Sequence, residues 1–246
     1  MHLEQQAEHR SALIFGGSRG IGAAISKRLA REGHSVALTY VSRPDAAEEV
    51  VTGIRALGGV AMAIKADSTD KHAVDAAVHQ TVERLGPLKV AVVNAGIYRS
   101  APLEEVSSQM LDELLNINVR GAFFAIQSAA SVMGSGARII TIGSSVAIRS
   151  GFAGGGLYSM TKAGLAALVR ELAVEISPRG ITINNVQPGP VETEITAGFL
   201  DAMLPRSHVG RVGQPEDIAS LVSYIAGSES SYMTGTSITM DGGFVL

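Results

Sequence analysis

Short apolar runs and segments with helical apolar spacing alternate along this chain of 246 residues. The apolar runs that favour strands are residues 11–15, 35–40, 60–66, 88–94, 137–143, 181–187 and 236–241. Helical patterns lie between them at residues 21–31, 46–57, 70–85, 110–130, 157–177 and 210–227. The strand runs are almost wholly apolar, which is typical of strands that helices cover on both faces.

Alternation of this kind predicts βαβ units, and therefore an α/β fold with a Rossmann-type, doubly wound parallel sheet of about seven strands and helices on both faces. No linker, repeat or low-complexity segment interrupts residues 11–246, so we expect a single domain. The polar opening, residues 1–10, is expected to be a flexible tail. In such a sheet, ligands bind beyond the carboxyl ends of the strands, so functional residues should follow each strand directly.

The composition argues against several classes of function. Charged residues make up only 17% of the chain and the net charge is -3, which disfavours a nucleic-acid binder that neutralises phosphates. Cysteine is absent, so there is no disulfide or thiolate site, and the six histidines form no metal-binding pair. The chain opens with no signal-peptide pattern and has no apolar run long enough for a membrane span. We therefore expect a cytoplasmic protein with no metal, nucleic-acid or membrane partner.

A glycine-rich segment, GGSRGIG (16–22), joins the first predicted strand to the first predicted helix. Glycines at this point let the backbone turn tightly and approach a pyrophosphate, and the helix N-terminus presents free N–H groups to the phosphates. A plain strand-to-helix turn would not need so many glycines. The spacing is GxxxGxG and differs from the GxGxxG of the common dinucleotide fold. The segment indicates a dinucleotide site.

The charge that follows the second predicted strand bears on which dinucleotide binds. Enzymes that use NAD usually carry an acidic residue there, which bonds the ribose 2′-hydroxyl. Here the stretch that begins at Thr39 has no acid before Asp45; instead, Arg43 follows the strand and Arg19 lies in the glycine loop. Two guanidinium groups suit a 2′-phosphate, to which Ser42 can also donate a hydrogen bond. We therefore predict NADPH/NADP rather than NAD; ordinary surface charge is the alternative for each arginine.

Seven short motifs follow one another along the chain: GGSRGIG (16–22), NAG (94–96), NVRG (118–121), IGSS (142–145), YSMTK (158–162), QPGPVET (187–193) and MDGG (240–243). In order and spacing, the set resembles the short-chain dehydrogenase/reductase family, in the short, non-extended branch that includes 3-oxoacyl carrier-protein reductases. The resemblance spans residues 11–243. It implies an NADP(H)-dependent oxidoreductase that reduces a ketone or aldehyde, or oxidises the secondary alcohol, by hydride transfer, with a 3-oxoacyl thioester among the candidate substrates.

Tyr158 and Lys162 stand one turn apart on a predicted helix, so their side chains should point the same way. A free phenol has a pKa of about 10, and a nearby ammonium and a helix N-terminus should both lower the pKa of Tyr158. The resemblance implies that Tyr158 is the general acid in reduction and the general base in oxidation. It also implies that Lys162 bonds the nicotinamide ribose.

Ser145 and Asn118 complete the catalytic set that the resemblance implies. Ser145 stands thirteen positions before Tyr158 and matches the family serine that bonds the substrate oxygen, whereas its neighbour Ser144 is expected to cap or to bond the backbone. Asn118 matches the asparagine that holds a water for a proton relay. Asn116 is a competing position for that role, and a helix-bending side chain is the alternative for Asn118.

The residues that the resemblance assigns to the cofactor follow the ends of the predicted strands. They are Gly16, Ser18, Arg19, Gly20, Ile21, Gly22, Ser42, Arg43, Asp67, Ser68, Asn94, Ala95, Gly96, Tyr158, Lys162, Pro188, Gly189, Val191 and Thr193. Asp67 is expected to meet the adenine, although it, Ser68 and Thr69 are also candidate caps for the third predicted helix. Phe15 and Val93 stand where the family usually has Thr and Asn, and we interpret them as an apolar contact that replaces a polar one.

The substrate is expected over the nicotinamide, under a variable loop at residues 194–210. The predicted lining comprises Phe199, Leu200, Met203 and Leu204 from this loop, and Ile97, Tyr98, Ala147, Ile148 and Phe152 from elsewhere. Arg99 and Arg149 are candidates for attracting an anionic substrate, with plain surface charge as the alternative. A lid of apolar residues would exclude water from the reaction.

Two further expectations concern partners and the class of function. Apolar helices at 110–130 and 157–177 imply a homodimer or homotetramer, as in the family, unless both helices are satisfied within one subunit. The alternative function is a nucleotide-binding regulator, of the cyclic-di-GMP type, that retains the reductase fold. An intact Asn–Ser–Tyr–Lys set favours the enzyme, because a sensor needs no proton donor.

Overall fold

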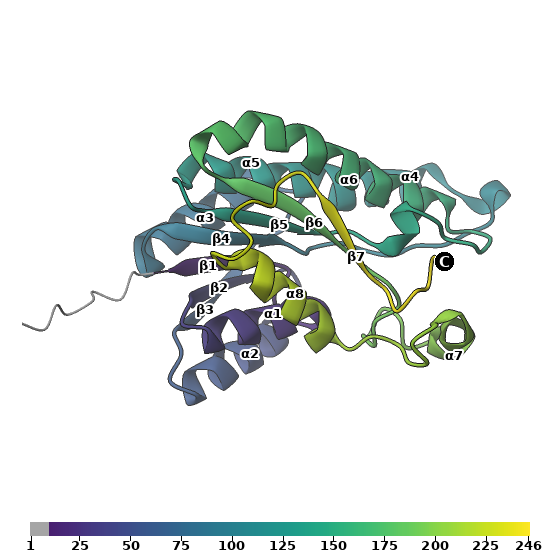
Figure 1. The fold of residues 1–246 in the computed structure, drawn as a ribbon, viewed down its shortest axis with the longest axis horizontal. Helices are drawn as coiled ribbons and strands as arrows, with labels where there is room; N and C mark the ends of the chain where they lie inside the picture. The colour runs from purple at the N-terminus through teal and green to yellow at the C-terminus, as the bar shows by residue number, and fades with distance from the viewer. Residues whose placement is uncertain (1–9) are drawn as a thin grey trace, which may run out of the picture.

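A computed structural model describes residues 10–246 and contains one seven-stranded parallel sheet (Figure 1). Its strands are Ser11–Phe15 (β1), Ser35–Tyr40 (β2), Ala61–Lys65 (β3), Leu88–Val93 (β4), Arg138–Ile142 (β5), Thr182–Pro188 (β6) and Ser237–Met240 (β7). Their order across the sheet is β3-β2-β1-β4-β5-β6-β7. The predicted fold class is confirmed, and each strand lies within one residue of its predicted bounds. The predicted tail, apart from Arg10, falls outside the described residues.

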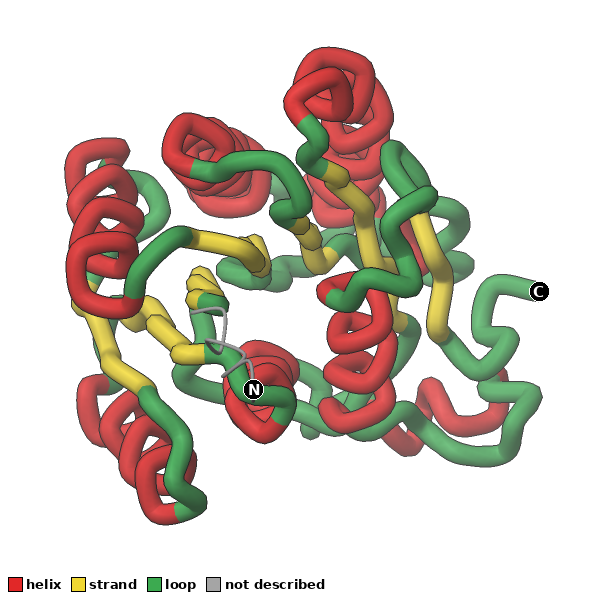
Figure 2. Tube along the Cα trace, turned by 60° about the vertical axis from the view of Figure 1, so that its left-hand side comes forward, coloured by secondary structure: helices red, strands yellow, loops and turns green. Residues whose placement is uncertain are grey.

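Two layers of helices cover the sheet, one on each face (Figure 2). The helices are Gly20–Arg31 (α1), Pro44–Ala56 (α2), Lys71–Leu85 (α3), Ser108–Leu115 (α4), Ala122–Val132 (α5), Gly156–Ile176 (α6), Leu200–Met203 (α7) and Pro215–Ala226 (α8). Side chains alternate along β1, so Leu13 and Phe15 pack under α3, α5 and α6, whereas Ala12 and Ile14 pack against α1, α2 and α8. No helix within residues 10–246 is long and apolar enough to cross a bilayer.

The predicted helix at 110–130 is divided by a turn of π-helix, Asn116–Gly121, between α4 and α5. A π turn widens the helix and is often found at functional positions. Here it carries Asn118, and Gly121 lies so close to the loop after β3 that a Cβ there would stand 2.9 Å from the Ser68 carbonyl oxygen. The turn is therefore fixed between the sheet edge and α6.

The cap of α3 differs from the one predicted at residues 67–69. Asp70 caps this helix, because its carboxylate accepts hydrogen bonds from His72 N at 2.9 Å and Ala73 N at 3.4 Å. Asp67 instead accepts from Thr69, at 2.9 Å from the backbone N and 2.8 Å from Oγ1. Asp67 thus belongs to the loop at the end of β3.

Phe15 and Val93 are directly paired across β1 and β4, and only 1% and 3% of their surfaces are exposed. Phe15→Thr is expected to lower the free energy of unfolding by about 3 kcal/mol or more, because it opens a cavity and buries a hydroxyl group without a partner. Adding Val93→Asn should recover part of this loss by supplying that partner. Urea unfolding of the two single variants and the double variant measures the coupling. Strictly additive losses would contradict the pairing.

Candidate active site

The glycine-rich loop after β1 turns tightly at the carboxyl edge of the sheet. Gly16 and Gly20 have φ angles of 73° and 50°, in the left-handed region that favours glycine. A Cβ on Gly22 would stand 2.2 Å from the Gly16 carbonyl oxygen. That oxygen also accepts a hydrogen bond from Asn94 Nδ2 at 2.7 Å, and Thr39 Oγ1 accepts one from Gly16 N at 3.0 Å. The loop is therefore held by the residues that end β2 and β4.

The N-terminus of α1 opens into a groove of about 730 Å³ along this edge. No side chain caps the helix, so its first N–H groups are free for an anion. Of the predicted cofactor residues, those that line the groove are Gly16, Ser18, Arg19, Gly20, Ile21, Ser42, Arg43, Asp67, Ser68, Asn94, Ala95, Gly96 and Thr193. Gly22 packs beneath the loop, while the remaining predicted residues, Tyr158, Lys162, Pro188, Gly189 and Val191, line an adjoining cavity.

Both arginines at the ribose corner of the groove form exposed ion pairs. Arg19 Nη1 lies 3.0 Å from Glu194 Oε2, and Arg43 Nε lies 3.3 Å from Asp45 Oδ1. Exposed pairs of this kind contribute little stability, so either guanidinium can exchange its partner for a phosphate at small cost. The end of β2 presents Thr39 and Ser42 but no carboxylate to the groove.

Asn118 links the loop after β4 to α6. Its Oδ1 accepts from Ile97 N at 2.9 Å, and its Nδ2 donates to Ile97 O at 2.9 Å and to Thr161 Oγ1 at 3.2 Å. Thr161 in turn donates to the Tyr158 carbonyl oxygen at 2.8 Å. Asn116 lines the groove and takes no part in this network. The structure thus separates the two asparagines and places Asn118 behind the catalytic helix.

Tyr158 and Lys162 lie on the first turns of α6, one above the other as predicted. Lys162 Nζ stands 5.7 Å from the centroid of the Tyr158 ring and donates a hydrogen bond to the Ile142 carbonyl oxygen at 2.9 Å. That carbonyl ends β5, so the ammonium is fixed at the sheet edge. Gly96 packs against this site, since a Cβ there would stand 3.3 Å from Asn118 Oδ1 and 3.5 Å from Lys162 Nζ.

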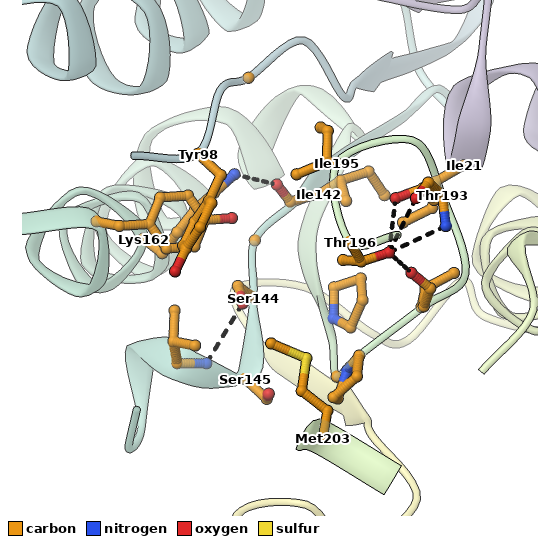
Figure 3. Close-up of a pocket in the computed structure, with 18 of the residues that line it drawn as sticks. Ile21, Tyr98, Ile142, Ser144, Ser145, Lys162, Thr193, Ile195, Thr196 and Met203 are labelled. Carbon is orange, nitrogen blue, oxygen red and sulfur yellow. Dashed lines mark hydrogen bonds between the residues drawn. The ribbon is translucent and has the colours of Figure 1, made fainter. Parts of the chain in front are cut away.

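Ser144 and Ser145 lie just after β5. Ser144 Oγ accepts a hydrogen bond from Val146 N at 3.4 Å, so the predicted backbone contact of Ser144 is confirmed. Ser145 begins a 3-10 turn, Ser145–Ala147, and is 1% exposed. Both serines line the cavity, with Ser144 on the side that faces Lys162 and Tyr98 and Ser145 beyond it (Figure 3).

Residues 16–245 match a family profile described as enoyl-(acyl carrier protein) reductase. The cyclic-di-GMP-binding biofilm dispersal mediator protein of Escherichia coli is 39% identical over 240 residues, which cover 96% of this chain and 97% of the relative. The chain belongs to the short-chain dehydrogenase/reductase family. A 3-oxoacyl-(acyl-carrier-protein) reductase of Staphylococcus aureus is 38% identical over 96% of this chain and 98% of its own length.

Solved structures of the short-chain dehydrogenase/reductase family superimpose closely on this chain. A member from Serratia marcescens has a TM-score of 0.94 and 46% identity, covering 96% of this chain and 98% of its own. A short-chain dehydrogenase from Burkholderia cenocepacia, in complex with NADP, has a TM-score of 0.94 and 43% identity over 97% and 98% of the two chains. BdcA in complex with NADPH has a TM-score of 0.86 and 39% identity over 96% and 94%.

Burial controls the proton affinities in this short-chain dehydrogenase/reductase. Withdrawal from water raises the pKa of Tyr158 to about 12; Ser144 opposes the shift and the neighbouring Tyr98 adds to it. Burial also lowers the pKa of Lys162 to about 8. The predicted lowering of the Tyr158 pKa is therefore not seen, because desolvation is the largest contribution and raises the pKa.

These two pKa values predict a pH profile for ketone reduction with Tyr158 as the proton donor. Such a reduction would need Tyr158 protonated, which holds up to about pH 12, and Lys162 as the ammonium, which holds only below about pH 8. We expect kcat/KM for NADPH, which reports the free enzyme, to be level below about pH 8 and to fall by up to about tenfold per pH unit well above it. A profile that stays level to pH 10 would contradict the role of the ammonium.

A cavity of about 170 Å³ adjoins Tyr158 in this short-chain dehydrogenase/reductase. Of the predicted walls, Ile97, Tyr98, Phe152, Phe199 and Met203 line it, whereas Ala147, Ile148, Leu200 and Leu204 do not. Residues that the sequence did not mark also line the cavity, among them Val146, Ile195, Thr196 and Phe244. Phe244 directly follows the MDGG motif (240–243), to which the sequence assigned no role in the cavity.

Proposed function

We propose that this chain is an NADP(H)-dependent oxidoreductase that reduces a ketone or aldehyde, or oxidises the corresponding secondary alcohol, by hydride transfer. The observation that carries the proposal is the meeting of a phenol, a serine hydroxyl and a buried ammonium where the groove joins the apolar cavity. Tyr158 supplies the first, Ser145 the second and Lys162 the third. Such a set of hydrogen-bond donors suits an oxygen that gains negative charge.

The groove residues fit a dinucleotide with a 2′-phosphate. The uncapped N-terminus of α1 and the glycine loop suit the pyrophosphate, and Arg19, Ser42 and Arg43 suit the 2′-phosphate. Lys162 and Asn94 lie where the groove meets the cavity, within reach of a ribose and an amide. NADPH bound there would supply the hydride. The NADP and NADPH complexes of the Burkholderia cenocepacia enzyme and BdcA support this choice of cofactor.

The side chains have distinct tasks in the proposed reduction. The Ser145 hydroxyl donates a hydrogen bond to the carbonyl oxygen of the substrate and holds it beside Tyr158. The Tyr158 phenol gives its proton to that oxygen as hydride addition makes it an alkoxide, whose proton affinity exceeds that of the phenol. The Lys162 ammonium then stabilises the phenolate through space. Asn118 holds Ile97 and α6 in register, so that the wall and the catalytic turn keep their spacing.

NADPH consumption with a panel of ketones and aldehydes, followed at 340 nm, tests the proposal. Turnover that Tyr158→Phe removes supports it; the absence of turnover throughout a broad panel, with NADPH bound, would overturn it. The alternative of a nucleotide-binding regulator has no observation that favours it over the enzyme.

The two serines offer a sharp test of which hydroxyl group meets the substrate. Ser145→Ala is expected to lower kcat for ketone reduction by about 10²-fold or more, because it removes a donor aimed at the developing oxyanion. Ser144→Ala, its matched control one position along the chain, should lower kcat by less than about tenfold. Steady-state rates at saturating NADPH measure both. The reverse order of effects would assign the catalytic role to Ser144.

We further propose that the chain forms a homodimer or homotetramer through α5 and α6. These helices expose large apolar side chains, with Phe123 37%, Met160 49% and Val174 74% exposed. Apolar surface left open to this extent on neighbouring helices favours association. Light scattering coupled to gel filtration determines the assembly.

A further inference from the structure

The cavity beyond Tyr158 is small and apolar. At about 170 Å³ it is smaller than the 300–1,000 Å³ that is usual for drug-sized ligands. Its substrate-side walls are apolar or aromatic: Tyr98, Val146, Phe152, Ile195, Phe199, Met203 and Phe244. Lys162 is its only charged lining residue among the described residues, and the hydrogen bond to Ile142 O fixes this ammonium beside the catalytic tyrosine. No charged group remains for the distal end of a substrate.

Three aromatic rings follow one another from the catalytic tyrosine to the lid. The Tyr98 ring meets the Tyr158 ring edge to face, with centroids 5.0 Å apart and planes at 84°. It meets Phe199 of the loop before α7 in the same manner, at 5.8 Å and 68°. A carbonyl group held at Tyr158 therefore brings the adjoining carbon skeleton against Tyr98 and Phe199. Edge-to-face rings of this kind leave faces and edges that suit a further flat ring.

The cation nearest to the far wall is already engaged. The Arg206 guanidinium lies 4.0 Å from the centroid of the Phe244 ring, and its Nη1 donates to the Ser150 carbonyl oxygen at 3.1 Å. This side chain joins the segment after α7 to the β5–α6 loop and to the C-terminal segment, so it closes the wall instead of receiving a ligand. Arg99, the other candidate for an anion, pairs with Glu113 at 2.9 Å. Arg149 is exposed and does not line the cavity.

From these contacts we infer that the substrate is a compact, uncharged ring ketone, and that Tyr98 and Phe199 select it. The inference rests on the proposed reductase function and names its substrate class. A keto acid would have to bury its carboxylate without a cation, which is costly in an apolar cavity. A linear 3-oxoacyl thioester would have to pass a polar pantetheine arm between the lid and Tyr98, where two rings are in contact. A fused or single ring fills the same space with apolar surface.

The parent enzyme decides between these classes of substrate. Initial rates with NADPH are compared for 2-tetralone and cyclohexanone, for the N-acetylcysteamine thioester of acetoacetate, and for phenylpyruvate, which carries a ring and a carboxylate. We expect kcat/KM for 2-tetralone to exceed that of the thioester and of phenylpyruvate by at least tenfold. A thioester or keto acid reduced as well as 2-tetralone overturns the inference and leaves the reductase function standing. Reduction of none of these compounds by NADPH-bound enzyme overturns both.

Substitutions of the ring pair test the two named residues. Tyr98→Ala and Phe199→Ala are each expected to lower the ratio of kcat/KM for 2-tetralone to that for acetone by about tenfold, whereas Tyr98→Phe should keep the ratio within about threefold. The control is Leu204→Ala, in the same lid but outside the cavity lining, which should leave the ratio unchanged. A general loosening of the fold would lower both rates together and leave the ratio as it was. A ratio unchanged in both alanine variants would overturn the assignment.

Discussion

Tyr158→Phe is expected to lower kcat for ketone reduction by about 10²–10⁴-fold, which is the usual loss when a general acid is removed. The ring of the variant keeps its edge-to-face contact with Tyr98, so the packing of the cavity should change little. NADPH affinity should stay within about threefold of the parent value. The phenol proton is transferred to the reacting oxygen of the substrate and takes no part in binding NADPH in the groove. Stopped-flow or steady-state rates, together with fluorescence titration of NADPH, measure the two quantities separately.

The control for this variant is Tyr232→Phe, which removes the hydroxyl group of a fully exposed tyrosine and should have no effect on either quantity. Lys162→Ala is expected to differ from Tyr158→Phe by weakening NADPH binding as well as the rate, since the ammonium faces both the phenol and the groove. A Tyr158→Phe variant that turns over near the parent rate would show that another group supplies the proton.

Cofactor preference is the second large effect. Arg43→Ala is expected to lower kcat/KM for NADPH by about tenfold or more and to leave NADH nearly unchanged, because one charge-assisted hydrogen bond contributes roughly 1.5–3 kcal/mol. Ser42→Asp should reverse the preference, since a carboxylate at the end of β2 repels the 2′-phosphate and bonds the ribose hydroxyl of NADH. The ratio of kcat/KM for the two cofactors is the measurement.

Two features of the structure sharpen this test. To bind the 2′-phosphate, Arg43 gives up an exposed ion pair with Asp45, and Arg19 gives up one with Glu194. Each arginine therefore adds to the binding free energy only the difference between its contact with the phosphate and its contact with the carboxylate. Arg31→Ala is the matched control, because this exposed arginine ends α1 and does not line the groove. The assignment would be contradicted if the parent enzyme preferred NADH, or if Arg43→Ala lowered kcat/KM equally for both cofactors. Either result would show that the two arginines are ordinary surface charges.

The sequence predicted the sheet well because buried parallel strands leave a strong pattern. Each of the seven apolar runs is a strand, and the glycine loop lies where the motif indicates, since positive φ angles at Gly16 and Gly20 constrain the residue type. The residues around the groove follow from the same logic, because strand ends meet at one edge. Local spacing also placed Lys162 one turn from Tyr158.

The sequence did not predict features that depend on burial or on the path of the backbone outside the regular elements. The π turn at Asn116–Gly121 has a helical pattern in the sequence, so its extra width leaves no periodic signal. Phe244 follows the MDGG motif, but nothing in the sequence shows that the C-terminal segment returns to the cavity. The raised pKa of Tyr158 arises from burial, which spacing along a helix does not report.

The Asn118 side chain hydrogen-bonds the backbone of Ile97 as a residue of a neighbouring strand would. Its amide accepts from the N–H of Ile97 and donates to the C=O of the same residue, as a peptide unit would in a sheet, so one side chain extends the ladder beyond the end of β4. No other side chain of similar size offers both polarities: aspartate would keep the acceptor and turn a second oxygen toward the Ile97 carbonyl. Replacing Asn118 would therefore disturb the backbone around Ile97 as well as any proton relay. A loss of activity in such a variant has a structural cause available and is not evidence for the relay.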